Sequence, residues 1–332
     1  NIDTSAFELS ASGLFIPQIN ASKTCEIEGV QHALPPDAFH EFLDSILISN
    51  PTSIIVLDKD YIDDNAVLSP YIIQSGMDVI LDLNGKNVEY NGKEQLFQIN
   101  AGGSLTVTDS GSEPYDETIT IVDHTTAEPG TLNGEILTYY TTKSTGIVKG
   151  DSHAEVNTEE ETQEHTLTVT EYGRLFSTSD NIRKADCLVR VDGGKFELER
   201  GILANQGGEH NILTMNGGTV TMTGGYLIGA ASTGNGGGIL AGSTSGDITI
   251  SGGVIAANTA AKNGGGIACT SPESKRKIEI SGNAVIAGNT AGNSGGGIFF
   301  RYPSDTTLKA QSGTVNISGG MVTNNITNTP TG

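Results

Sequence analysis

Several residue types that stabilise compact globular domains are scarce in this sequence of 332 residues. It has no tryptophan, three cysteines, 5% aromatic residues and only 17% charged residues. The cysteines, Cys25, Cys187 and Cys269, are too few and too widely spaced for a disulfide framework or a CxxC metal site. We therefore expect them to be small buried apolar residues. No apolar run reaches the ~18 residues that cross a membrane as a helix.

Basic residues are also few, with 18 lysines and arginines against 39 aspartates and glutamates. The formal net charge of −21 gives a surface that repels other anions. This excess of negative charge argues against nucleic acid and anionic membranes as partners, because both need a basic surface.

Glycine is abundant, with 44 residues, and it recurs in two phrases that keep a common period. The first phrase, Ser/Thr-Gly-Gly/Asn, has its leading glycines at Gly224, Gly252, Gly282 and Gly319, which lie 28, 30 and 37 residues apart. The second phrase, Gly-Gly-Gly-Ile, begins at Gly236, Gly264 and Gly295, spaced 28 and 31 residues. Two phrases in constant phase indicate one repeating structural unit, which is typical of stacked architectures.

Each repeat contains three short runs rich in apolar and β-branched residues, for example Asp247–Ile250, Val254–Asn258 and Gly266–Cys269. Runs of this length predict strands, and three strands in about 30 residues predict one coil of a parallel β-helix. Stacked coils place equivalent residues in columns. The expected inward columns are Ile250, Ile280, Ile317 and Ile239, Ile267, Ile298. Structural roles are predicted for the corner glycines Gly252, Gly282 and Gly319 and for an asparagine ladder of Asn258, Asn289 and Asn325.

The phrases at residues 253–267 and 283–298 resemble right-handed β-helix repeats of bacterial surface proteins. They are similar to repeats of polymorphic outer-membrane and autotransporter passengers and to adhesin-like surface proteins of Firmicutes. The resemblance implies the pectate-lyase-like superfold and an extracellular or cell-surface location. It leaves the activity open, because enzymes and adhesins share this scaffold.

The rest of the chain extends this prediction to an all-β, right-handed parallel β-helix solenoid with lateral excursions. Residues 1–50 are expected to hold N-terminal strands and, at 36–49, an amphipathic helix that caps the first coil through residues such as Phe39 and Leu43. The solenoid then occupies residues 51–332, with irregular coils over 51–214 and regular repeats over 215–325. Loop or hairpin excursions are expected at about 110–183, where prolines and an acidic run interrupt the pattern.

Within the irregular coils, three glycine pairs precede alternating apolar residues and predict one strand in successive coils. They are Gly102–Gly103, Gly193–Gly194 and Gly217–Gly218.

Candidate chemistry is sparse, and we predict no catalytic residue. The densest carboxylate cluster includes Asp60, Asp63 and Asp64. Oxygen ligands at this density suit Ca²⁺, but a solvated acidic turn explains them as well. Phe300, Arg301 and Tyr302 lie in a longer loop and are a candidate ligand contact, with a core role for the phenylalanine equally open.

Two function hypotheses remain open at this point. The first is a non-enzymatic extracellular β-helix that acts as an adhesin or rigid binding scaffold for a host or environmental glycan or protein. The alternative is a carbohydrate-active enzyme, a polysaccharide lyase or glycoside hydrolase, with its site in the excursions. Because the pattern stops in mid-repeat after Asn325, we also expect the sequence to be part of a longer polypeptide.

Overall fold

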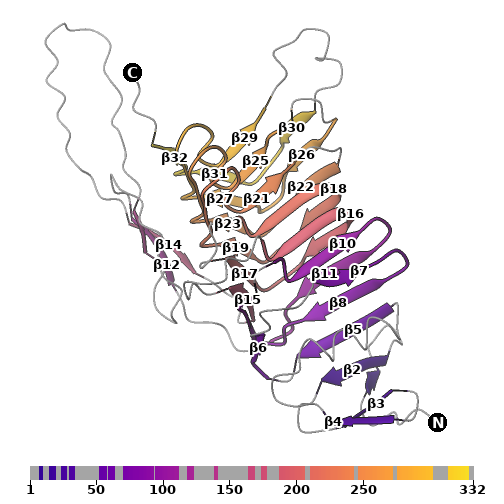
Figure 1. Ribbon diagram of the computed structural model, residues 1–332. Coiled ribbons are helices and arrows are strands. Elements are labelled where there is room, and N and C mark those ends of the chain that lie inside the picture. The colour runs from indigo at the N-terminus through magenta and orange to yellow at the C-terminus, as the bar shows by residue number, and fades with distance from the viewer. Residues whose placement is uncertain are drawn as a thin grey trace, which may run out of the picture.

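The computed structural model describes residues 7–9, 15–19, 24–27, 30–33, 52–57, 59–63, 70–92, 94–111, 118–122, 138–140, 164–168, 173–177, 187–205, 210–242, 246–271, 275–301 and 313–328. All regular elements in these ranges are β-strands, and nearly all neighbouring strands pair in parallel. The chain therefore forms a parallel β-helix whose coils stack along one axis (Figure 1). The same ranges contain no helix that is long and apolar enough to cross a membrane.

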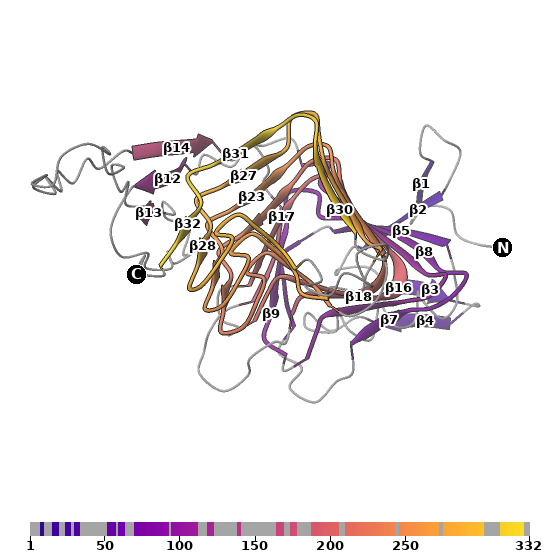
Figure 2. The same cartoon turned by 90° about the horizontal axis from the view of Figure 1, so that it is seen from above.

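Each coil contributes strands to three faces, which surround an interior seen end-on in Figure 2. The first face contains β7 (Tyr71–Ile73), β10 (Phe97–Asn100), the first halves of β16 (Val189–Leu198) and β18 (Leu213–Met222), β21 (Ile239–Ala241), β25 (Ile267–Cys269) and β29 (Ile298–Phe300). The second face contains β5 (Thr52–Leu57), β8 (Asp78–Asp82), β11 (Ser104–Thr108), the second halves of β16 and β18, β22 (Gly246–Ile250), β26 (Lys277–Ile280) and β30 (Thr314–Ile317).

The third face is an eight-stranded sheet of β6 (Tyr61–Asp63), β9 (Asn87–Tyr90), β15 (Arg174–Ser177), β17 (Ile202–Asn205), β19 (Tyr226–Ile228), β23 (Val254–Ala256), β27 (Val285–Ala287) and β31 (Met321–Thr323). In the later coils a short strand follows the third face. These strands form the sheet of β20 (Ala231–Ser232), β24 (Thr259–Ala260), β28 (Thr290–Ala291) and β32 (Ile326–Thr327).

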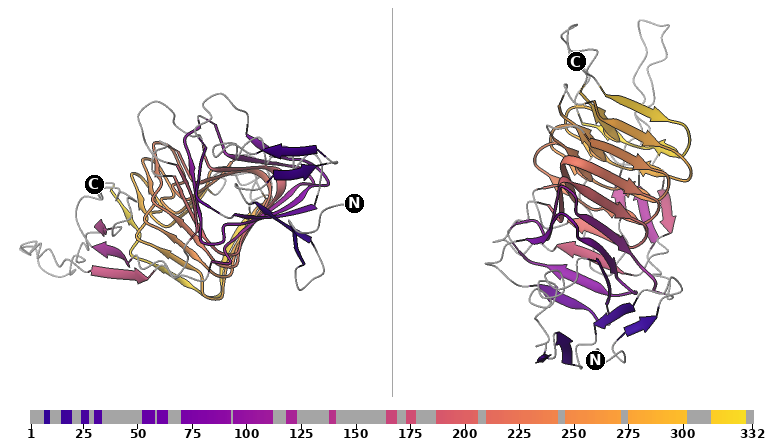
Figure 3. Two further views of the ribbon diagram at one scale, coloured as in Figure 1. Left: turned by 90° about the horizontal axis from the view of Figure 1, so that it is seen from below. Right: turned by 90° about the vertical axis from the view of Figure 1, so that its right-hand side faces the viewer.

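Alternation along each strand places every second side chain inside, where parallel pairing stacks it on its equivalent in the next coil. On the second face, Val79 pairs with Leu105, and Leu105 with Phe196; all three side chains are buried. The register of the two columns expected from the sequence is confirmed: Ile250, Ile280 and Ile317 pair in succession, as do Ile239, Ile267 and Ile298. The first two members of each column are fully buried, whereas Ile298 is half-buried and Ile317 is 53% exposed. Figure 3 shows how the strands that carry these columns stack along the solenoid.

The glycine pairs precede the same strand in successive coils, as the sequence predicts, and they lie at the corner between the first and second faces. Gly103, Gly194 and Gly218 immediately precede the second-face strand residues Ser104, Lys195 and Thr219, which pair with one another. In β16 and β18 the chain passes this corner without leaving the strand, so each forms a single ten-residue element that belongs to both faces.

The corner between the second and third faces contains Gly252, Gly282 and Gly319. Successive coils approach closely there: a Cβ atom on Gly252 would lie 2.2 Å from the carbonyl oxygen of Thr223, and one on Gly282 would lie 2.2 Å from that of Ser251. A larger residue at either position would therefore push two coils apart.

Buried amides join the coils at the corner after the third face. Asn258 Nδ2 donates to Asn289 Oδ1 at 3.0 Å, and Asn289 Nδ2 donates to Asn325 Oδ1 at 2.8 Å. The same oxygens also accept the backbone N–H of the preceding asparagine. Residues just before the ladder take positive φ, including Ala257 at 62°, so the amides point inward at a sharp turn.

The outer side of the third face is also apolar and buried in its later strands. Ala204, Ile228, Ala256 and Ala287 are at most 4% exposed and form a second hydrophobic cluster with Tyr226. This cluster lies on the opposite side of the sheet from the interior columns, so the third face is covered on both sides.

Between the second and third faces, the chain leaves the coil and forms a separate three-stranded sheet, ordered β13-β12-β14. Its strands are β12 (Thr118–Val122), β13 (Thr138–Tyr140) and β14 (Glu164–Thr168), drawn beside the third face in Figures 1 and 2. The coil resumes at β15, which pairs with β9 and β17.

A buried carboxylate stands where this excursion leaves and rejoins the solenoid. Asp109 is 0% exposed, and its Oδ1 accepts the backbone N–H of Gly85 at 2.6 Å and of Gly111 at 3.1 Å. Its Oδ2 accepts the N–H of Gly173 at 2.8 Å. One side chain therefore ties both ends of the excursion to the preceding coil.

At the N-terminus, β1 (Phe7–Leu9) and β2 (Phe15–Ile19) pair antiparallel, and β2 continues the second face by pairing with β5. A hairpin of β3 (Thr24–Ile27) and β4 (Val30–Ala33) follows. The capping helix predicted at 36–49 lies outside the described residues.

Candidate binding site on the first face

Polar side chains form a row on the outer surface of the first face, across β10, β16 and β18. Gln98, Arg190 and Thr214 occupy one line, because Gln98 pairs with Arg190 and Arg190 with Thr214. Asn100 and Asp192 pair in a second line, which Asn216 extends onto β18 through a side-chain bond to Asp192. These six residues are called the polar face, and all of them are half-buried.

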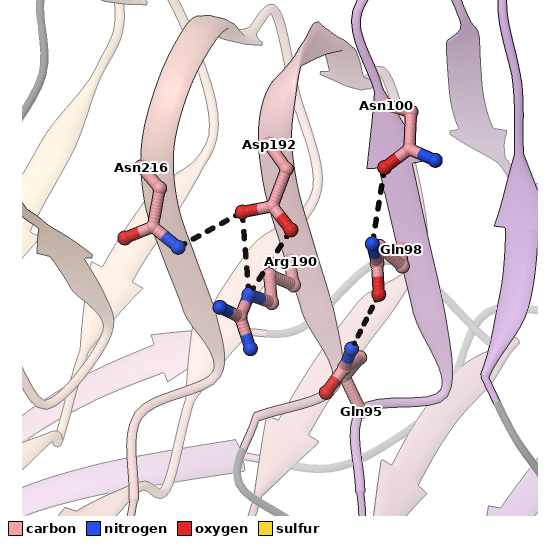
Figure 4. A network of polar contacts seen from close by, with 6 residues as sticks. All are labelled: Gln95, Gln98, Asn100, Arg190, Asp192 and Asn216. Carbon is pink, nitrogen blue, oxygen red and sulfur yellow. Dashed lines mark hydrogen bonds and ion pairs between the residues drawn. The ribbon is translucent and has the colours of Figure 1, made fainter.

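The side chains of the polar face hold one another in place, as Figure 4 shows. Asp192 accepts the Nε–H of Arg190 at 3.2 Å and the Nδ2–H of Asn216 at 2.8 Å. On the neighbouring strand, Gln98 Nε2 donates to Asn100 Oδ1 at 3.0 Å. Gln95, which is 4% exposed, donates to Gln98 Oε1 at 2.9 Å and supports the row from beneath. Each bond reduces the rotamer freedom of a surface side chain, so the polar groups are ordered before any ligand arrives.

Several donor and acceptor groups of the polar face are not used in these contacts. Arg190 uses only its Nε, and its two terminal nitrogens make no hydrogen bond to the described residues. Its side chain is 36% exposed, so these nitrogens can reach an external acceptor. Asn100 and Asn216 each use one end of the amide within the row, which leaves a donor on Asn100 and an acceptor on Asn216.

A groove of about 420 Å³ adjoins the polar face at the corner with the second face. Glycine turns of three successive coils form the floor of the groove. Its wall on the side of the second face contains one polar residue from each coil: Asp78, Ser104 and Lys195. This glycine groove is lined by Gly76, Met77, Asp78, Gly102, Gly103, Ser104, Gly193, Gly194 and Lys195. Gly102 and Gly193 follow Asn100 and Asp192 closely in the chain, so the groove continues from the polar face.

Charged groups at the groove are exposed and oppositely signed. Asp78 and Lys195 lie one strand either side of Ser104 in the same column, and neither makes an ion pair with the described residues. A Cβ on Gly76 would meet no atom within 4 Å, so this end of the floor faces open space. The combined surface of the groove and the polar face offers hydrogen-bond donors and acceptors along four adjacent coils.

Comparisons of this chain with protein-family models, with curated proteins and with solved structures found no match. The function must therefore be argued from the site itself.

The aromatic candidates from the sequence are only partly placed. Phe300 pairs with Cys269 and packs against the interior cluster, whereas Arg301 is exposed beyond the end of β29. Phe299 is the outward residue of this strand and lies in the same line as Arg190, three strands beyond Thr214. Tyr302 lies outside the described residues.

The acidic candidates are placed at the start of the third face. Asp60 accepts the backbone N–H of Asn87 at 2.8 Å, and Asp63 ends β6. Asp64 lies outside the described residues. In the described part of the chain, no three His, Cys, Asp or Glu residues are grouped as metal ligands.

Among the described residues, two titratable groups have raised pKa values, and the surroundings of each group explain its shift. Burial, and then the nearby charge of Glu199, raises the pKa of Glu197 on the outer surface of the second face. Burial also raises the pKa of the Cys269 thiol, although Arg276 opposes the shift by its charge and by a hydrogen bond. Cys269 is 1% exposed in the interior column of the first face, so this thiol is a core residue.

Sequence reasoning did not single out the polar face, although a signal exists. Asn100 stands two residues before a glycine pair, and Asp192 and Asn216 stand immediately before one. The glycine pairs align these strands, and the same alignment brings the preceding polar residues together.

Proposed function

We propose that this chain is a rigid, non-enzymatic binding scaffold of an extracellular or cell-surface protein, acting as an adhesin. The observation that carries the proposal is the polar face, where Asp192 fixes the Arg190 guanidinium while its terminal nitrogens stay open. Ordered polar groups on a continuous sheet lower the entropic cost of binding. The extracellular location is supported by the resemblance of the repeats to bacterial surface proteins.

The architecture supports a scaffold role because every coil is bonded to its neighbours by strand ladders and, in the later coils, by buried asparagines. A solenoid of this kind holds side chains of different coils at fixed spacing, which suits recognition of an extended ligand, either a glycan or a protein. The carboxylate of Asp192 is already bonded to Arg190 and Asn216, which suits a positioning role better than proton transfer.

The proposal is tested by probing glycan and host-protein arrays with the purified chain and with the double variant Arg190→Ala/Asp192→Ala. We expect at least one ligand to be retained by the parent chain and lost by the variant. Failure of the parent chain to bind any ligand, or equal binding by the variant, would contradict the proposal. Incubation with acidic polysaccharides, with and without Ca²⁺, tests the enzymatic alternative, and reproducible cleavage would exclude a purely adhesive role.

A further inference from the structure

The polar face and the glycine groove each cover three coils and share two of them, and the chemistry of the combined surface defines a ligand class. Resting on the proposed function, we propose that this surface binds an uncharged, linear oligosaccharide that lies along the solenoid axis. The groups that carry this assignment are Arg190, Asn100 and Asn216 on the polar face and Lys195 with Ser104 in the groove.

Both hydrogen-bond donors and acceptors face outward, which matches sugar hydroxyls because each hydroxyl donates one bond and accepts others. Arg190 presents two open nitrogens, and Asn100 presents an open amide nitrogen. The free oxygen of Asn216 and the hydroxyl of Ser104 supply acceptors. Groups of both kinds at neighbouring positions can engage adjacent hydroxyls of one sugar ring.

Charge balance favours an uncharged ligand over an acidic one. Arg190 is paired with Asp192, and the groove contains one exposed cation, Lys195, and one exposed anion, Asp78. The site is thus close to neutral, while the whole chain carries −21. A polyanionic glycan would gain little at the site and would be repelled by the rest of the surface.

The same surface is poorly suited to a protein partner. Protein interfaces draw most of their binding energy from aromatic and large apolar anchors in a central patch. Here the outward residues carry amides, hydroxyls, two carboxylates, a guanidinium and an ammonium group, and the floor is glycine backbone with Met77 as its only apolar side chain. A floor made largely of glycine backbone leaves room for the face of a sugar ring.

The direction of the ligand follows from the strand register. Equivalent residues of β10, β16 and β18 stack along the solenoid axis, so the polar groups repeat about every 4.8 Å in that direction. A chain that runs along the axis meets one set of groups per coil. Affinity should therefore increase with oligosaccharide length until the ligand spans the three coils that carry the polar face, and then become constant.

The experiment measures binding of neutral linear glucans, xylans and mannans of increasing length by isothermal titration calorimetry, with galacturonan and heparin oligosaccharides as acidic probes. Arg190→Ala and Lys195→Ala should each weaken binding of the best neutral probe about tenfold, through loss of a charged hydrogen-bond donor. Arg190→Lys should also weaken it, because an ammonium lacks the planar fork.

Lys277→Ala is the matched control, since Lys277 is an exposed lysine in the same column as Lys195 but outside the groove. This variant should bind the probe as the parent chain does.

The possible outcomes separate this inference from the proposed function. Preferential binding of acidic probes, or of an array protein through Arg190, would overturn the uncharged-oligosaccharide assignment and leave the scaffold proposal standing. Binding of neutral probes that is unaffected by Arg190→Ala and Lys195→Ala would place the site elsewhere and also overturn the inference. Absence of binding to every probe and array would contradict both.

Discussion

Single buried amides determine how firmly neighbouring coils are joined. Asn289 is fully buried and its side chain makes four hydrogen bonds: it donates to Ile255 O and Asn325 Oδ1, and it accepts from the backbone and side chain of Asn258. We expect Asn289→Ala to lower the free energy of unfolding by about 2–4 kcal/mol, because it leaves several buried groups without partners. Urea denaturation followed by circular dichroism measures this loss.

Asn283→Ala is the control for that substitution, since Asn283 is exposed and contributes its backbone N–H, which alanine retains. It should change stability by less than about 0.5 kcal/mol. Equal denaturation midpoints for the two variants would show that the ladder contributes no more than an ordinary surface amide.

Glu197 gives the second residue-scale prediction, a dependence of stability on pH. Its folded-state pKa is raised, chiefly by burial and further by Glu199, so the folded chain binds this proton more tightly than the unfolded chain. The favourable contribution of this protonation to stability is complete at pH values below the pKa of Glu197 in the unfolded chain. It is lost as the pH rises through the higher pKa of Glu197 in the folded chain. Glu197→Gln should therefore stabilise the chain slightly at neutral pH, and the gain should vanish in acid.

Thermal unfolding of the parent chain and of Glu197→Gln across this pH range measures the difference. Glu279→Gln is the matched comparison, because Glu279 occupies the same outward line of the second face three strands further on. A gain for Glu197→Gln that persists unchanged into acid would show that the effect is not due to ionisation.

At the residue scale, the sequence repeats predict the strand on which a residue lies better than they predict which side chains touch one another. Asn100, Asp192 and Asn216 can be assigned to successive strands because glycine pairs follow them. The register between β16 and β18 shifts after Val191, so Asp192 pairs with Gly217, while the side chain of Asn216 still donates to the Asp192 carboxylate. A bulge of this kind arises from local backbone geometry and leaves no distinct sequence pattern.

At the scale of elements, Asp109 controls how the excursion is attached. We expect Asp109→Asn to lower the free energy of unfolding by about 2–4 kcal/mol, since an amide nitrogen would replace one of the oxygens that accept N–H groups of Gly85, Gly111 and Gly173. Hydrogen exchange should speed up first at those three amides. Asp247→Asn, which alters an exposed carboxylate bonded to the Lys277 N–H, should cost less; equal losses would contradict a clamp at Asp109.

The strands also differ in how well they are covered. Ile250 and Ile280 are fully buried, whereas Ile317, their partner in β30, is 53% exposed. Amide protection measured by hydrogen exchange should therefore fall from β22 and β26 towards β30 and β31. Uniform protection across these four strands in a monomer would contradict this expectation.

Among the elements, the regular strands were predictable because glycine turns and alternating β-branched residues both mark them. For example, the predicted strand Asp247–Ile250 is one residue shorter than β22, which begins at Gly246. The double burial of the third face was not predictable from the same pattern. Ala204, Ala256 and Ala287 are small residues that suit either an exposed or a covered position. Only packing from outside the coil decides between these positions.

At the scale of the whole molecule, the charge and the apolar surface are unevenly distributed. The chain carries −21, yet residues 313–328 contain no charged side chain. Four apolar residues in this stretch are exposed: Val315 by 39%, Ile317 by 53%, Met321 by 54% and Val322 by 41%. Among the described strands, β30 and β31 end their respective lines, so no other described strand pairs with their outer edges.

The negative charge and the exposed apolar surface have opposite effects on association between chains, and the ionic strength determines which effect dominates. At low salt, repulsion between chains of −21 acts over a long range and keeps them apart. At about 1 M salt the Debye length falls to about 3 Å, so repulsion is screened while the attraction between apolar surfaces persists.

We expect sedimentation velocity to show association that rises with salt and is suppressed by Ile317→Lys or Met321→Lys. Ile62→Lys, which alters an equally exposed residue in β6, should leave association unchanged. Equal suppression by all three lysines would mean that added charge anywhere prevents association, and that residues 313–328 are not the contact surface.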